Sequence, residues 1–568
     1  MRSGNHNGKI SVHAISGNHV VTLGLDATDE AMVGLLGFAI RRTQEAKNES
    51  YFMRGYKPFK EVYPQPKPGV YYSSSEQPIQ SFIWGDYAVE AGQTYGYEVI
   101  PVYGTPKNLK YGESVVVEIT AEKLENDKHE IFFNRGVAAS QAYAVKFGDK
   151  KPHQITDPVV RKDVYDWLSR GLIESIINFI KQAGDGDRIY AALYELDYPP
   201  VMDAMKSAQL RGADVKIIYH AKKEEKQTTD NERVLFNAGF TLDDKVATFA
   251  RTHPGNISHN KFFILIKGET PKQVFTGSTN ISEGGIFGHS NLGHCIKDDV
   301  VAADYLRYWE ALKNDPTQEE LDDVVEDLQP DIDPDNIPMG TTVIFSPRKT
   351  DAMMDVYVKA LGNAKELGNI TLSFNMDKRF LAELERKTDA VRYVILNKDK
   401  EPDKKKKGTE IILKEGMDYV QHFRRDGDVY IAPGGMIGEG WEQWLKETLT
   451  GFNGSTVLYI HTKFMLIDAL TNDPIIITGS ANFSKASTDT NDENMLIIRG
   501  NTRVADIYLG EFFRIYDHLY FRYIVTKFAK DDEEGGFLAS DSDEWLRLYR
   551  NPNSSKFKKR KIFSFGFD

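Results

Sequence analysis

Two segments of this chain carry the same polar residues at the same spacing. The first contains His259-Asn260-Lys261 and Gly277-Ser278-Thr279-Asn280, and the second contains His461-Thr462-Lys463 and Gly479-Ser480-Ala481-Asn482. In each copy the histidine precedes the lysine by two residues and the glycine by eighteen, so one offset of 202 residues superimposes both. A duplication that preserves His, Lys, Ser and Asn, rather than apolar residues alone, duplicates a site. We therefore expect one site built from both copies.

The apolar residues that follow each H-x-K segment predict a buried strand. These runs are residues 262–266 in the first copy and 464–467 in the second. Alternation along a strand places residues i and i+2 on one face, so the histidine and lysine of each copy point the same way. A second predicted strand ends at each glycine, where the missing side chain lets the backbone approach a phosphate closely.

The pattern of H-x-K, then Asp, then G-S-x-N resembles the HKD motif of the phospholipase D superfamily, and the resemblance covers residues 155–525. It implies an α/β fold of two pseudo-symmetric repeats, with mixed sheets covered by helices. It also implies phosphodiester cleavage through a covalent phosphohistidine, without metal or cofactor. Because both repeats lie in one chain, we expect the monomer to hold a complete site.

The residue types suit this reaction. A phosphodiester needs a nucleophile, a proton donor for the leaving alkoxide, and positive charge around its non-bridging oxygens. The histidines and lysines of the two motifs supply these groups. The remaining motif residues fall into two expected classes: phosphate-binding Ser278, Asn280, Ser480 and Asn482, and orienting or structural Asn291, Asp468, Gly277 and Gly479.

The two copies differ at the positions expected to orient the histidines. Where the motif has Asp, the second copy has Asp468 and the first has Ile266. Eleven residues after the motif Asn, the second copy has Glu493, in a segment that resembles the one carrying the histidine-orienting Glu in the small bacterial endonuclease of the family. The first copy has Asn291 there.

This difference predicts a division of roles. We expect Glu493 to contact His461 and raise its pKa, which makes His461 the general acid. We expect Asn291 to fix the tautomer of His259, which then attacks as the nucleophile. This order agrees with the usual one in the family, in which the N-terminal histidine attacks. Alternatively, with Ile266 and Asn291 replacing carboxylates, the first repeat is degenerate.

Patterning outside the motifs divides the chain into parts. Short alternating segments separated by Gly, Pro, Asn and Asp turns predict an antiparallel β-sandwich near the N-terminus, and residues 94–99 resemble the tyrosine-corner region of fibronectin type III domains. Alternating helices and strands follow, including a predicted helix at 165–183. The predicted parts are a sandwich at 1–125, repeats at 150–320 and 339–527, an acidic linker at 321–338, and a C-terminal surface tail at 528–568 with one helix near Trp545.

Composition limits the partners. A net charge of −12 argues against a protein that coats nucleic acid by bulk electrostatics. The single Cys295 excludes an intramolecular disulfide and fits a reducing compartment. There is no signal-peptide pattern, and the longest apolar stretch, residues 31–40, is too short to span a bilayer. We expect a cytoplasmic protein without stable membrane insertion, with oligomerisation possible through the N-terminal domain.

Three further features have more ordinary explanations than a binding site. His253, His259, His289 and His294 lack a recognised metal-ligand spacing. Lysine-rich runs at 398–407 and 556–561 could bind nucleic acid or anionic lipid, although solvated surface is favoured. Trp441 and Trp444 are more typical of a packed helix than of a substrate groove.

The reaction class is therefore clearer than the substrate. The leading hypothesis is a nuclease that acts on DNA or RNA, because the second repeat most resembles the bacterial endonuclease. The alternative within the same chemistry is a phospholipase D that hydrolyses or transfers phosphatidyl headgroups. A third hypothesis, of another class, is a catalytically weak binding module whose sandwich domain recruits a partner.

Overall fold

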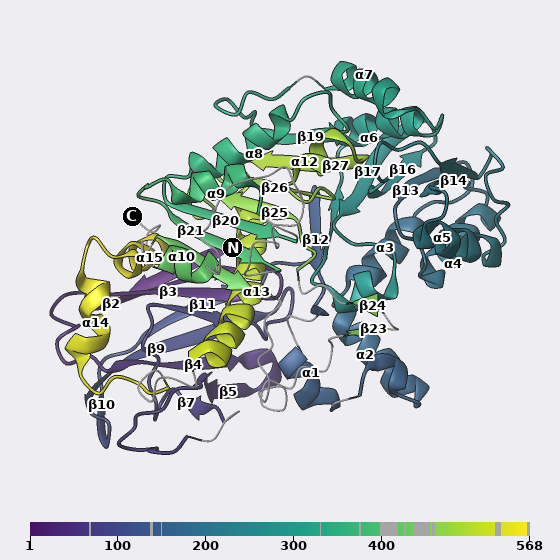
Figure 1. Cartoon of the computed structure of the whole chain (residues 1–568). Coiled ribbons are helices and arrows are strands. Elements are labelled where there is room, and N and C mark those ends of the chain that lie inside the picture. The colour runs from purple at the N-terminus through teal and green to yellow at the C-terminus, as the bar shows by residue number, and fades with distance from the viewer. Residues whose placement is uncertain are drawn as a thin grey trace.

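A computed structural model gives the fold (Figure 1). It describes residues 1–66, 70–136, 140–148, 150–329, 331–373, 376–397, 419–424, 428–434, 451–452, 455–456, 460–528 and 536–564. The N-terminal strands, purple in Figure 1, form a layered β-region at the lower left, while the first repeat lies at the right in teal and the second above the sandwich in green. The predicted combination of a β-region with two mixed α/β repeats is confirmed.

The N-terminal region consists of two antiparallel sheets. The first has the order β1-β2-β3-β8, formed by Arg2–His6, Ile10–Ser16, Val21–Ala27 and Ile83–Asp86. The second has the order β10-β9-β4-β5, with β11 also on β9, formed by Asn108–Tyr111, Thr94–Thr105, Gly37–Gln44, Glu49–Phe52 and Val115–Thr120. The backbone N–H of Glu90 donates to the Tyr95 hydroxyl at 2.8 Å, a contact typical of a tyrosine corner.

The C-terminal segment is part of the sandwich core rather than a surface tail. It forms α14 (Ser542–Arg550) and α15 (Ser555–Ser564). Trp545 and Leu546 are buried among the sandwich side chains, and the Trp545 indole donates to the carbonyl of Leu35 at 2.8 Å. The apolar side chains of α14 pack against the sandwich, whereas most of its other residues are polar. The polar composition of this segment therefore favoured a surface position in the sequence analysis.

The lysine-rich run at 556–561 serves internal contacts. The Lys559 ammonium lies 3.9 Å from the centre of the Tyr430 ring of the second repeat, while Arg560 and Lys561 each contact a carboxylate oxygen of Asp26 at 2.8 Å. The run therefore joins the sandwich to the second repeat, which differs from the expected solvated surface. The run at 398–407, Trp441 and Trp444 lie outside the described residues.

The two repeats contain sheets of identical strand order. The first is β12-β18-β17-β16-β13-β14-β15, formed by His129–Phe133, Leu292–Ile296, Thr270–Gly277, Lys261–Lys267, Arg188–Leu193, Asp214–His220 and Thr248–Arg251. The second is β19-β27-β26-β25-β20-β21-β22, formed by Gly340–Ser346, Glu493–Arg499, Ile475–Gly479, Phe464–Ile467, Leu367–Leu372, Val391–Leu396 and Val429–Pro433. In both, three strands run parallel and the others antiparallel, so the duplication extends to the whole sheet.

Helices cover both faces of each sheet. The outer face of the first packs on α3 (Leu172–Lys181), α4 (Pro199–Leu210) and α5 (Lys226–Asn237), and that of the second on α8 (Ala352–Gly362) and α9 (Lys378–Glu385). The inner faces share one core with α6 (Asp299–Leu312) and α13 (Thr502–Phe528). This central layer holds the two repeats together and brings their motifs to one interface.

Three local features differ from the expected boundaries. The helix expected at 165–183 is two helices, α2 (Pro158–Ser169) and α3, because Arg170 and Gly171 have φ values of 51° and 91°. This break lets the buried Arg170 pair with Glu511 of α13. Strand β12 joins the first repeat before residue 150, and α7 (Gln318–Leu328) overlaps the expected linker.

We predict that Trp545→Ala destabilises the protein by about 3–5 kcal/mol, the usual cost of removing a large aromatic side chain from a core. The control is Leu548→Ala on the same helix, whose side chain is 38% exposed, with an expected cost below about 1 kcal/mol. Urea unfolding of both variants checks this. Equal losses would contradict the packing of α14 into the sandwich.

Candidate active site

The segments that lead into the two motifs are hydrogen-bonded across the interface between the repeats. The backbone N–H of His259 donates to the carbonyl of Asp492 at 2.9 Å, and that of His461 donates to the carbonyl of Ser290 at 3.2 Å. These contacts are related by the same 202-residue offset as the motifs. Each histidine is therefore held at its backbone by the opposite repeat.

The side-chain partners of the histidines are also exchanged between repeats. The Nδ1 atom of His259 lies 2.9 Å from both carboxylate oxygens of Glu493, and the Nδ1 atom of His461 lies 2.9 Å from the Oδ1 atom of Asn291. The expected pairing, in which Glu493 contacts His461 and Asn291 contacts His259, is wrong. The reason is the backbone hydrogen bonds between the repeats. Asp492 and Ser290 accept the N–H groups of His259 and His461, and the next residues, Glu493 and Asn291, therefore lie beside the rings of those histidines.

These contacts determine the tautomer of both rings. A carboxylate or an amide oxygen can only accept, so Nδ1 carries the hydrogen in each histidine. Asn291 supports its assigned orientation because its Nδ2 atom donates to the carbonyl of Gly285 at 2.7 Å. Within the described part of the chain, neither Nε2 atom of His259 or His461 has a hydrogen-bond partner. Both rings therefore keep Nε2 available for a substrate.

Burial sets the charge of these groups. It lowers the pKa of His259 to about 4, although Glu493 acts in the opposite direction. Burial, together with the charge of Lys463, lowers the pKa of His461 well below its usual value. Although burial opposes ionisation, the neighbouring His259 and Lys261 hold the pKa of Glu493 below its usual range. Near neutral pH, the imidazoles of His259 and His461 are therefore neutral in the free protein, and the Glu493 carboxyl is ionised.

The motif lysines are buried and contact the backbone of the histidines. Lys261 donates to the carbonyl of His259 at 2.6 Å, and Lys463 donates to that of His461 at 2.7 Å. Burial lowers the pKa of Lys261 to about 8, and burial and the charge of Lys261 lower that of Lys463 well below its usual value. An anionic phosphate beside these lysines favours their charged form, and the poorly hydrated ammonium groups then attract it strongly.

The motif serines make hydrogen bonds within their own repeats. Ser278 and Ser480 are fully buried. The hydroxyl of Ser278 donates to Oδ1 of Asn291 at 2.8 Å, and that of Ser480 donates to the carbonyl of Asn494 at 3.3 Å. Ser278 therefore orients Asn291, the partner of His461, and Ser480 holds the residue after Glu493. A contact of either hydroxyl with a substrate phosphate stays a prediction.

The motif asparagines retain unused hydrogen-bonding atoms. Asn280 donates from Nδ2 to the Oε2 atom of Glu195 at 2.7 Å. The Oδ1 atoms of Asn280 and Asn482 are buried and have no hydrogen-bond partner among the described residues. A role for both side chains in binding substrate remains a prediction.

The motif glycines and Asp468 support the strands. A Cβ atom at Gly277 would lie 2.4 Å from the carbonyl oxygen of Leu292, and one at Gly479 would lie 2.2 Å from that of Asn494. Close strand pairing, rather than approach to phosphate, accounts for these glycines. Asp468 accepts the backbone N–H groups of residues 365–367, which anchors the start of β20.

Sequence reasoning missed an ion pair that joins the repeats at the site. The Arg251 guanidinium contacts the two carboxylate oxygens of Asp492 at 2.9 and 3.2 Å, and both side chains are fully buried. Asp492 also accepts from the backbone of His259, so this pair positions the first histidine. Its only sequence signal is a carboxylate next to Glu493. Sequence reasoning also missed Glu195, which no motif marks.

The described residues contain no group of three or more His, Cys, Asp or Glu side chains arranged to hold a metal ion. His289 lies beside His461, with ring centres 5.3 Å apart, whereas Nε2 of His294 is hydrogen-bonded to Nδ1 of His129 at 3.0 Å.

No helix in the described ranges combines the length and apolar character needed to cross a membrane.

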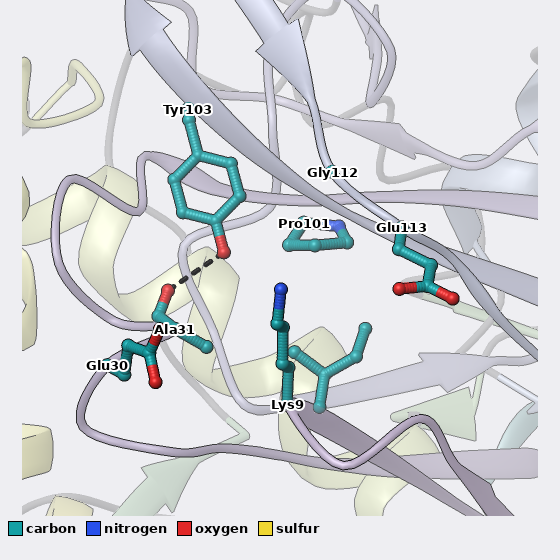
Figure 2. A pocket seen from close by; sticks show the side chains of 8 residues that line it. Lys9, Glu30, Ala31, Pro101, Tyr103, Gly112 and Glu113 are labelled. Carbon is teal, nitrogen blue, oxygen red and sulfur yellow. Dashed lines mark hydrogen bonds between the residues drawn. The ribbon is translucent and has the colours of Figure 1, made fainter.

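A separate cavity of about 220 Å³ lies in the N-terminal sandwich (Figure 2). Figure 2 shows Lys9 pointing between Tyr103, Pro101 and Glu113, and the Tyr103 hydroxyl donating to the carbonyl of Ala31. The cavity contains none of the motif residues. The candidate catalytic groups lie elsewhere, at the interface of the repeats.

Comparison with known proteins identifies the repeats. The family model described as "Cardiolipin synthase, PLD-like domain" matches residues 176–313 and 358–516, together just over half of the chain. A comparison with curated protein sequences finds no significant match.

Several solved structures are similar to the chain. Phosphatidylserine synthase from Haemophilus influenzae is 13% identical, with a TM-score of 0.44 over 70% of this chain and 93% of its own. Nuc, a phospholipase D family member from Salmonella typhimurium, is 23% identical, with a TM-score of 0.21 over 25% and 87%. Polyphosphate kinase from Porphyromonas gingivalis is 12% identical, with a TM-score of 0.36 over 59% and 43%, so the chain spans less than half of that protein.

The buried histidines predict loss of stability in acid. Burial lowers the pKa values of His259 and His129 to about 4, whereas an unfolded histidine titrates near about 6.5. The unfolded chain therefore binds more protons between these values, and the free energy of unfolding falls as pH drops from 6.5 towards 4, by about 1.4 kcal/mol per unit of pKa difference. Urea unfolding across this range measures the slope. His129→Gln should reduce the dependence of the free energy of unfolding on pH, whereas the control His253→Gln, at an exposed position, should leave it unchanged. An unchanged dependence in His129→Gln would contradict the prediction.

Proposed function

The chain belongs to the phospholipase D superfamily, and on this premise we propose that it cleaves phosphodiesters through a covalent phosphohistidine without a metal ion. The observation that carries the proposal is the exchanged pairing of His259 with Glu493 and of His461 with Asn291. It gives two histidines in one site, with free Nε2 atoms but unequal partners. The two lysines beside them supply the positive charge that a metal ion would otherwise provide.

The unequal partners support His259 as the nucleophile. When its Nε2 atom bonds to phosphorus, the imidazole gains positive charge, and the Glu493 carboxylate on Nδ1 stabilises that charge. His461 has only an amide oxygen on Nδ1, so its imidazolium is less stabilised and releases a proton more readily. The role expected for each histidine is kept, although the physical reason is the opposite of the one proposed from sequence.

The reaction then has two steps. In the first, the Nε2 atom of His259 forms a bond to phosphorus, the ester P–O bond breaks, and the leaving oxygen takes a proton from Nε2 of His461. Binding of the anionic diester next to His461 favours the protonated form that this step needs. In the second, water attacks phosphorus, gives its proton to His461, and the P–N bond to His259 breaks.

A nucleic acid is the substrate that we propose first, because residues 490–494 resemble the corresponding segment of the small bacterial endonuclease. A phospholipid headgroup is the second candidate, because the matched family model is described by cardiolipin synthase. Parallel assays on single- and double-stranded DNA, RNA and vesicles of phosphatidylcholine or phosphatidylglycerol separate the two. Turnover of vesicles alone would exclude the nuclease proposal.

We predict that activity survives chelation. The charge at the phosphate comes from Lys261 and Lys463, so millimolar EDTA should change the rate by less than about twofold in assays on a soluble diester. Loss of turnover in EDTA, restored by a divalent cation, would overturn the mechanism. A soluble substrate avoids the effect of cations on a vesicle surface.

We predict that the phosphorylated residue is His259. In His461→Ala, cleavage of a p-nitrophenyl diester should continue, because p-nitrophenolate leaves without a proton, and the adduct should accumulate because its hydrolysis lacks a base. His259→Ala should form no adduct, and turnover should fall by at least about 10³-fold. Mass spectrometry of peptides after a neutral quench locates the phosphate, with the exposed His253→Ala as the control. Phosphate on His461 in the unmodified protein would reverse the assignment.

A further inference from the structure

A third acidic group lies at the proposed catalytic site, outside both motifs. Glu195 follows β13, and its side chain is half-buried. Its Oε2 atom accepts from Nδ2 of Asn280 at 2.7 Å and from the hydroxyl of Ser282 at 3.2 Å. Its negative charge acts on both motif lysines, raising the pKa values of Lys261 and Lys463 against the effect of burial.

Within the described part of the chain, hydrogen bonds reach one of its two oxygens. Among the described residues, no group donates a hydrogen bond to the Oε1 atom of Glu195, whereas Oε2 is held by two donors. The carboxylate is therefore fixed in direction while one strong acceptor stays open beside the phosphate-binding lysines. A carboxylate next to a phosphate repels it, so this placement needs a compensating contact from the substrate.

The geometry of displacement indicates which part of the substrate is near Glu195. In an in-line reaction, the attacking and leaving atoms lie on one axis, here the axis joining His259 and His461. The non-bridging oxygens and the ester oxygen of the retained alcohol lie around that axis, where the lysines are. Because Glu195 holds Asn280 and acts on both lysines, it lies beside these equatorial positions. A carboxylate repels the anionic non-bridging oxygens, so the retained alcohol is the equatorial group that it can bind.

We propose that Oε1 of Glu195 binds a hydrogen-bond donor on the alcohol that stays attached to phosphorus in the covalent intermediate. The substrate class is a phosphodiester whose retained alcohol carries a hydroxyl or an ammonium group on the carbon next to the ester carbon. This inference rests on the proposed function and adds to it a specificity-determining residue.

The experiment varies only the retained alcohol. Three p-nitrophenyl phosphodiesters with 2-aminoethyl, 2-hydroxyethyl and ethyl groups share one leaving group, so kcat/KM reports recognition of the retained side. The unmodified protein should prefer the amino and hydroxyl esters over the ethyl ester by about tenfold, as one charge-assisted hydrogen bond implies. Where a diester is not turned over, its inhibition constant against whichever substrate is cleaved gives the same comparison.

Glu195→Gln tests the open oxygen selectively. Glutamine keeps one oxygen to accept from Asn280 and Ser282, but replaces the open acceptor by an amide that donates. The preference should fall to about one. The control is Asp197→Asn in the same loop, which removes a neighbouring half-buried carboxylate and should leave the preference unchanged.

The outcomes distinguish the two proposals. Equal kcat/KM for the three esters in the unmodified protein, or a preference that survives Glu195→Gln, would overturn the role of Glu195 and leave phosphodiester cleavage intact. Equal loss of preference in Asp197→Asn would show a general field effect and also overturn it. No cleavage of these esters, nucleic acid or vesicles would instead contradict the proposed function.

Discussion

The structure of the site depends on the exchange of hydrogen bonds between the repeats. Neither histidine is oriented by its own repeat, since His259 is held by Asp492 and Glu493 and His461 by Ser290 and Asn291. An isolated repeat would therefore present an unoriented imidazole. The buried ion pair of Arg251 with Asp492 supports the same contact, because removing one partner would leave an uncompensated charge in the core. Association of the repeats and formation of the site are thus one event.

Desolvation is the second constraint. The motif histidines and lysines are buried, which makes both imidazoles neutral in the free protein and leaves the ammonium groups poorly hydrated. A binding phosphodiester brings the negative charge that these groups lack. Glu493 and Glu195 partly offset the lysines beforehand, and they do so from different directions: Glu493 from behind His259, and Glu195 from beside Asn280. The site is prepared for one anion in one orientation.

The helix α13 connects this interface to the rest of the molecule. Its apolar side chains pack between the two sheets, while its charged residues contact other parts of the chain. Glu511 pairs with Arg170 of the first repeat, Asp506 with Arg2 of the sandwich, and the Tyr87 hydroxyl donates to Asp517. The C-terminal helices then close the sandwich, so the N-terminal domain is fixed to the catalytic repeats rather than attached by a free linker.

The duplicated spacing of His259 and His461 was enough to predict two α/β repeats and one shared site, because strand periodicity and a preserved set of polar residues are local properties of a sequence. The strands predicted at 262–266 and 464–467 are present as β16 and β25 for the same reason. The partner of each histidine was not local: Glu493 lies 32 residues from His461 but contacts His259, 234 residues away. The packing of one repeat against the other decided that pairing, and the folding of each repeat decided the contacts of Ser278, Ser480 and Glu195. Sequence alone did not reveal them because contacts between residues far apart in the chain leave no local period.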